Sequence, residues 1–172
     1  DISMQYRLIR TLPIARLMIR YRAFIFCALL ALFCFTLHYS ALVGGWRYDD
    51  PAHLFFAAQY SPWEYFSVPE VMLQQSWAHI TPWNALFYDI GITLFGLNPM
   101  GHYAHQLSII FLTSVAMFFL LQLWVNQWKA FAAAMLFLSM PATAVVGQLL
   151  MTGHYAYGLL FSILAIYTFI LS

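Results

Sequence analysis

Residues 23–43 read AFIFCALLALFCFTLHYSALV and contain no charged residue. A helix of these 21 residues, rising ~1.5 Å per residue, can cross the ~30 Å hydrocarbon core of a bilayer. The rest of the 172-residue chain is similar in character, with 63% hydrophobic and 8% charged residues, whereas soluble domains are about one quarter charged. A soluble fold of this length could not bury so much apolar surface. We therefore expect an all-α polytopic membrane protein.

The apolar pattern predicts about four transmembrane helices within a transmembrane domain, residues 23–172. The predicted spans are residues 23–43, 103–124, 130–151 and 155–172. Pro141 should bend the third span, where Ala130 and Ala132 to Ala134 favour close helix packing. The extracytoplasmic loop 44–102 should contain short interfacial helices, because AHLFFAAQY and PWNALFYDIGITLFGL are apolar but too short or too polar to span. Pro82 suits the first turn of the second of these helices.

Residues 1–22 carry five of the seven Lys and Arg residues of the chain. This basic segment predicts a cytoplasmic N-terminus, which places the loop 44–102 on the extracytoplasmic face. Two interpretations of the segment remain open: an amphipathic helix at the lipid surface, or a solvated leader that only sets topology. We expect an integral membrane protein of a bacterial inner membrane. The formal net charge of +1 argues against nucleic acid as a partner.

Two adjacent carboxylates, Asp49 and Asp50, follow the first span in the sequence GGWRYDDPAHLFF. One carboxylate of such a pair can act as a general base, while its neighbour raises its pKa or holds a metal ion. The alternative is purely structural: Asp is a good N-cap and Pro51 suits the first turn of a helix. Both interpretations stay open on spacing alone.

Histidines gather on the same predicted side of the membrane. His102 and His105 are three residues apart and should share one helix face, where they could bind a metal ion, bind a phosphate or hydrogen-bond at the interface. Asp89 could neutralise Arg47 or support the site. The full set predicted at this face is Asp49, Asp50, His53, His79, His102, His105 and His154.

Several motifs in order resemble a known family. YDDPAHL follows the first span, LFGLNP at 94–99 precedes a Gly-His pair, and Pro141, Val145 or Val146, and Gly153 accompany the third span. This series resembles the N-terminal portion of the GT-C class membrane glycosyltransferases, especially the protein mannosyltransferase-like and TMTC-like branch. The resemblance covers roughly residues 23–172.

The resemblance implies an enzyme that moves a sugar from a polyprenyl-phosphate carrier to an acceptor hydroxyl on the extracytoplasmic face. Asp49 would be the general base, and Asp50 would orient the acceptor or contact a divalent metal ion. Donor phosphate or acceptor would be contacted by His53, His79, His102 and His105. Membrane lipid, the lipid-linked sugar donor and other membrane subunits would be the partners.

The chain also departs from the family pattern. Thr81 stands before Pro82, where the family often has Arg. Members of the family have many more spans and a soluble C-terminal domain, so we expect this chain to be part of a longer protein. The alternative is a non-catalytic GT-C-like subunit that serves as a structural or assembly partner in a larger membrane complex.

Overall fold

The computed structural model describes residues 13–75 and 81–172, with side chains from Tyr21 onward. Residues 1–12 of the predicted basic segment and His79 lie outside this part of the chain. Every regular element in the described ranges is helical, as predicted. The elements are α2 (Pro13–Leu37), α3 (Tyr39–Val43), α4 (Asp50–Gln59), α5 (Glu64–Ser67), α6 (Pro69–Gln75), α7 (Pro82–Phe95), α8 (Pro99–Leu121), α9 (Gln127–Ser139), α10 (Pro141–Gln148), η1 (Leu150–Thr152) and α11 (Gly153–Leu171).

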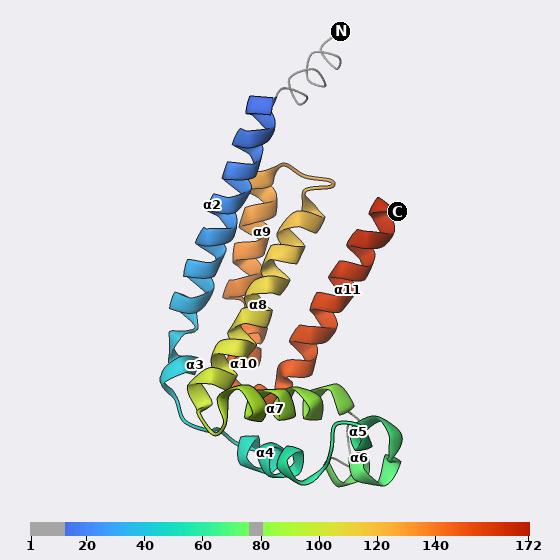
Figure 1. Ribbon diagram of the computed structural model, residues 1–172. Helices are drawn as coiled ribbons and strands as arrows, with labels where there is room; N and C mark the ends of the chain where they lie inside the picture. Colours follow the sequence, from blue (N-terminus) through green and yellow to red (C-terminus); the bar gives the residue numbers. More distant parts are fainter. Residues whose placement is uncertain (1–12, 76–80) are drawn as a thin grey trace.

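The long helices α2, α8, α9 and α11 run side by side, with the C-terminus and the start of α2 at the same end of the bundle (Figure 1). The shorter helices α3 to α7, together with α10, gather at the opposite end. Helix α8 is central and contacts α2, α3, α7, α9, α10 and α11. The segment between α3 and α8 therefore forms a cap on one end of the bundle.

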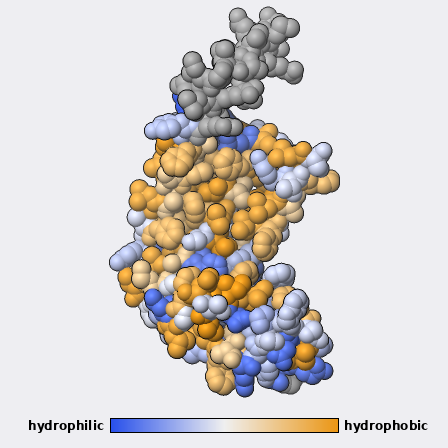
Figure 2. All heavy atoms as spheres, in the orientation of Figure 1, coloured by the Kyte–Doolittle hydropathy of each residue, from blue (hydrophilic) through white to orange (hydrophobic). Residues whose placement is uncertain are grey.

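Two helices of the described residues are long and apolar enough to cross a membrane: α8, and the continuous stretch Leu150–Leu171. A third span results if α9 and α10, which meet at an angle of 56°, cross together. The stretch predicted as the first span is divided at His38 into α2 and α3, and the described apolar part of α2, Tyr21–Leu37, is shorter. Apolar side chains dominate the face of the long helices in Figure 2, while hydrophilic residues are more frequent at the capped end. The total of four spans stays a prediction.

The bend between α9 and α10 falls at Pro141, as predicted, and is stabilised by side chains. Proline has no N–H to continue helical bonding, so backbone carbonyls at the end of α9 need other donors. His38 Nε2, on a side chain that is 2% exposed, donates to the Leu138 carbonyl at 3.1 Å. Thr143 Oγ1 donates to the Phe137 carbonyl at 2.6 Å. The interruption of α2 at His38 thus supports the bend in the neighbouring helix.

Close packing around α8 and α9 depends on small side chains. Ala130 and Ala134 lie four residues apart on α9 and are fully buried, where α9 meets α2 and α8. Small residues at such positions let helix backbones approach closely. The predicted role of these two alanines is consistent with this burial, whereas Ala132 is exposed.

We expect His38→Leu to lower the free energy of unfolding by about 1–3 kcal/mol, because the buried Leu138 carbonyl would lose its side-chain donor. Thermal unfolding of the detergent-solubilised protein measures this loss. The matched variant His38→Gln keeps an N–H donor of similar reach and should lose less. Equal stability of His38→Leu and the unchanged protein would show that the bend does not need this hydrogen bond.

Candidate functional site

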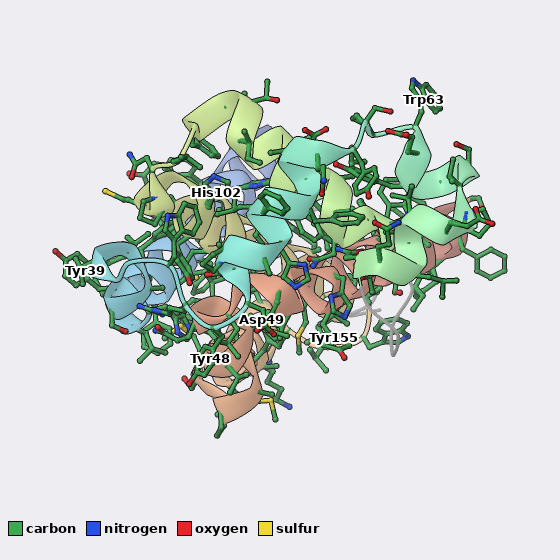
Figure 3. The ribbon with its side chains drawn as sticks, turned by 90° about the horizontal axis from the view of Figure 1, so that it is seen from below. Tyr39, Tyr48, Asp49, Trp63, His102 and Tyr155 are labelled. Atoms are coloured by element: carbon green, nitrogen blue, oxygen red, sulfur yellow. The ribbon has the colours of Figure 1, made fainter. Side chains whose placement is uncertain are left out.

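The two neighbouring aspartates end a tight turn formed by residues 47–50. Tyr48 has a φ of 46°, the left-handed conformation that non-glycine residues rarely adopt. The turn is closed by the Asp50 N–H, which donates to the Arg47 carbonyl at 2.9 Å. Asp49 is the N-cap residue of α4, but its side chain makes no capping hydrogen bond and is exposed. Figure 3, which looks onto this end of the bundle, shows Asp49 at the start of α4.

Asp50 is buried, with 1% of its surface exposed, and both of its carboxylate oxygens are occupied. Oδ1 accepts from the Tyr88 hydroxyl at 2.9 Å, and Oδ2 accepts from the Tyr103 hydroxyl at 2.8 Å and from the Arg47 N–H at 3.0 Å. Burial and the Asp50 carboxylate both raise the pKa of Tyr88, so this phenol stays protonated as a donor. Asp50 therefore joins α4 to α7 and α8. It does not cap α4 with its side chain.

Arg47 holds the turn against α10. Its guanidinium donates to the Gln148 carbonyl at 3.1 Å, to the Gln148 side-chain oxygen, and to the Ser40 carbonyl at 2.8 Å. A positive charge at the C-terminal end of a helix is favourable, because the last carbonyls carry partial negative charge. A Cβ at Gly44 would overlap this guanidinium, which would then have to shift. The Arg47 guanidinium also lies over the Tyr103 ring of α8, 5.0 Å from its centroid, and none of these contacts involves Asp89.

Asp49 lines a cavity of about 260 Å³ between α4, α6, the start of α7 and the η1–α11 segment. Seven of its ten lining residues have polar side chains, although more of the lining surface is apolar than polar. The lining residues are Asp49, Ala52, His53, Phe56, Gln74, Gln75, Thr81, Asn84, Met151 and His154.

His53 is a predicted substrate-binding residue that lines the same cavity as Asp49. Its ring stacks on Tyr88, with 5.2 Å between the centroids, and its Nδ1 lies 3.4 Å from Gln75 Nε2. Burial lowers the pKa of His53, while the negative charges of Asp49 and Asp50 oppose that shift and His154 adds to it. A neutral imidazole both donates and accepts hydrogen bonds. His53 can therefore serve a polar ligand next to the Asp49 carboxylate.

Acid should destabilise the fold through His53. Its folded-state pKa lies below the ordinary value of 6.5, so as the pH falls the unfolded chain binds a proton first. The contribution is complete above pH 6.5 and is lost as the pH falls through the lower, folded-state value. Unfolding temperatures measured across this range should fall less steeply in His53→Gln than in the unchanged protein. Parallel curves for the two proteins would contradict the assignment.

His102 and His105 lie at a second, smaller cavity. Its volume of about 20 Å³ suits one water molecule, and its lining includes Asn84, Tyr88, Gln106 and both histidines. His102 is 5% exposed, and its Nε2 donates to the Gly96 carbonyl at 3.0 Å. His105 Nε2 lies 3.4 Å from the Tyr157 hydroxyl. The two histidines share a face, as predicted, but they do not line the Asp49 cavity, so the predicted substrate-binding residues are divided between two places.

A divalent metal ion finds no suitable ligand set here. In the ranges 13–75 and 81–172, no group of three or more His, Cys, Asp or Glu side chains could hold one. Both oxygens of Asp50, the residue expected to contact a metal, already accept hydrogen bonds from protein groups. We therefore derive no step that uses a metal ion.

The structure adds residues that the sequence motifs did not mark. Thr81, Asn84 and His154 line the Asp49 cavity; all three were expected on this face, but none was among the predicted site residues. The pair Gln74-Gln75 also lines it and carries no motif. These residues come from separate segments, so only the folded chain shows that they meet.

The comparisons with known proteins give no relative. The chain matches no family of known proteins, and neither a curated protein nor a solved structure is significantly similar to it. The GT-C resemblance therefore depends on the motifs of the sequence alone.

Proposed function

We propose that this chain is the N-terminal part of a GT-C-like glycosyltransferase with four spans, a cytoplasmic N-terminus and an extracytoplasmic cap formed by the segment from α4 to α7. The arrangement of the helices supports this orientation, because the basic N-terminal side of α2 and the capped end lie at opposite ends of the bundle. The positive-inside rule then assigns the cap to the outer face, where its short helices would lie at the interface.

The proposed reaction transfers a sugar from a polyprenyl phosphate to an acceptor hydroxyl, with Asp49 as general base. The observation that carries the proposal is that one of the two neighbouring carboxylates is exposed and the other is buried. Asp49 is exposed and lines a cavity, whereas Asp50 is buried and held by three hydrogen bonds. Asp50 thereby fixes the turn and the position of its neighbour, and Asp49 is left able to accept a proton from a hydroxyl in the cavity.

His53 has a supporting role in this proposal. Its ring stacks on Tyr88, which itself donates to Asp50, so His53 is linked through Tyr88 to the buried carboxylate. A neutral imidazole at this place can orient the acceptor hydroxyl or the donor by hydrogen bonding. His102 and His105 would act on the bundle side of the same cap and not on the reacting groups.

A non-catalytic membrane subunit is the second candidate. The observation in its favour is the exposure of α11, since only 22% of the most apolar part of Leu150–Leu171 is buried. Such a surface needs lipid or further helices, which could belong to the rest of this chain or to other subunits.

Mass spectrometry of the complete protein, purified from membranes in mild detergent, separates the two candidates. A co-purifying polyprenyl-phosphate species, with sugar transfer to an added acceptor alcohol, is the result expected for the enzyme. A stoichiometric set of other membrane chains without bound polyprenyl phosphate, and without transfer, would overturn the enzyme and support the subunit.

A further inference from the structure

The imidazole of His53 is held by side chains from two neighbouring helices, α6 and α7. From α7, the Tyr88 ring stacks on it, with 5.2 Å between the centroids. From α6, Gln75 Nε2 lies 3.4 Å from His53 Nδ1, which is a long hydrogen bond. Stacking sets the plane of the ring, and the contact with Gln75 sets which edge of the ring faces α6.

The Gln75 amide can meet this ring in two orientations. With Nε2 toward the ring, the amide donates to Nδ1, and its buried Oε1 has no hydrogen-bond partner within residues 13–75 and 81–172. With Oε1 toward the ring, both amide N–H groups would instead take this buried place. In peptide groups, buried N–H groups without an acceptor are rarer than carbonyl oxygens without a donor, and here two such N–H groups would be buried. The first orientation is therefore favoured.

This orientation decides where a neutral His53 carries its proton. A ring nitrogen that accepts a hydrogen bond has no proton, so the proton of the neutral imidazole is on Nε2. In the part of the chain that the structure describes, no hydrogen bond reaches His53 Nε2, and His53 lines the Asp49 cavity. Nε2–H is therefore the ring group that is left to meet a ligand.

We propose that Gln75 is a positioning residue that fixes His53 as the neutral imidazole with its proton on Nε2. His53 then donates a hydrogen bond to an oxygen atom of a ligand in the cavity and takes no proton from it. Of His53 and Asp49, only Asp49 is then able to act as a base. The assignment of the tautomer stands apart from the proposed function, whereas its consequence for sugar transfer rests on that function.

Nuclear magnetic resonance of the complete protein in detergent micelles, with isotopically labelled histidine, tests the tautomer directly. Two-bond proton–nitrogen correlations show which ring nitrogen carries the proton, at a pH well above the ordinary histidine pKa of 6.5. The His53→Gln variant identifies the His53 signals by their absence. We expect the proton on Nε2. A proton mainly on Nδ1 in the unchanged protein would overturn the proposal without any variant of Gln75.

Two substitutions of Gln75 should change the tautomer in different ways. Gln75→Leu removes the donor, so the excess of the Nε2–H form over the Nδ1–H form should fall about two- to tenfold, the equivalent of one ordinary hydrogen bond. Gln75→Glu replaces the amide by a carboxylate, which only accepts hydrogen bonds and should place a proton on Nδ1. An unchanged tautomer in both variants would overturn the proposal.

The matched control is Gln74→Leu. Gln74 precedes Gln75 on α6 and lines the same cavity, but its side-chain oxygen accepts from the Tyr60 hydroxyl. The His53 tautomer should not change in this variant. An equal change in Gln74→Leu and Gln75→Leu would reveal a general disturbance of the cap and overturn the specific role of Gln75.

Sugar transfer tests the use of this hydrogen-bond donor. Gln75→Leu should lower the transfer rate about two- to tenfold, and Gln75→Glu should lower it further, in the order of their effects on the tautomer. Normal transfer by both variants, where Asp49→Asn is impaired, would overturn the use of His53 as a donor in the reaction. If transfer does not depend on Asp49, the proposed function fails, while the tautomers of the unchanged protein and of the Gln75 variants still decide the role of Gln75.

Discussion

We expect Asp49→Asn to lower the rate of sugar transfer by about 10²–10⁴-fold, the usual contribution of a general base. The amide cannot take the proton from the acceptor hydroxyl, although it has the size and shape of the carboxylate. The Asp49 side chain makes no capping hydrogen bond and is exposed, so the fold should not depend on it. Transfer from a polyprenyl-phosphate sugar, measured with the complete protein in detergent or nanodiscs, gives the rate.

The control is Glu70→Gln, which removes one exposed carboxylate from α6 of the same cap and does not line the Asp49 cavity. It should leave both the transfer rate and the unfolding temperature within error of the unchanged protein. Asp49→Asn should match the control in membrane insertion and in thermal unfolding. Normal transfer by Asp49→Asn would remove Asp49 from the role of base.

The helices of this chain follow from local sequence signals. Pro82 begins α7 and Pro141 bends the third predicted span, because proline lacks an N–H and suits a first turn. Long apolar stretches also predicted α8 and the helix after Thr152. The division of the first stretch at His38 was not predicted, and the bond of His38 to a carbonyl of α9, 100 residues away in sequence, has no local signal.

The candidate site was predicted only in part. Asp49 and His53 share the cavity because they lie four residues apart at the start of α4, a relation that the sequence itself contains. His154 joins them from a distant segment, and no local pattern marks it. His102 and His105 share a helix face, as their spacing predicts, but packing of His102 against Gly91 and its bond to Gly96 place them at the smaller cavity.

We expect Asp50→Ala to lower the free energy of unfolding by about 2–5 kcal/mol, because each buried donor that loses its acceptor costs about 1–3 kcal/mol. Removal of the carboxylate leaves the hydroxyls of Tyr88 and Tyr103 without their acceptor in a buried place. Chemical or thermal unfolding in detergent measures the loss. The hydroxyls come from helices that are 38 and 53 residues away in sequence, so their bonds to Asp50 tie the turn to two helices at once.

A double-mutant cycle assigns this loss to the hydrogen bonds. Tyr103→Phe alone removes one donor to Asp50, and its effect should shrink when Asp50 is already alanine, with a coupling of about 1–3 kcal/mol. The comparison of asparagine variants then separates the two neighbours. Asp50→Asn should lower stability first and transfer only as a consequence, whereas Asp49→Asn should lower transfer alone. Additive effects of Asp50→Ala and Tyr103→Phe would show that Asp50 does not hold the cap through Tyr103.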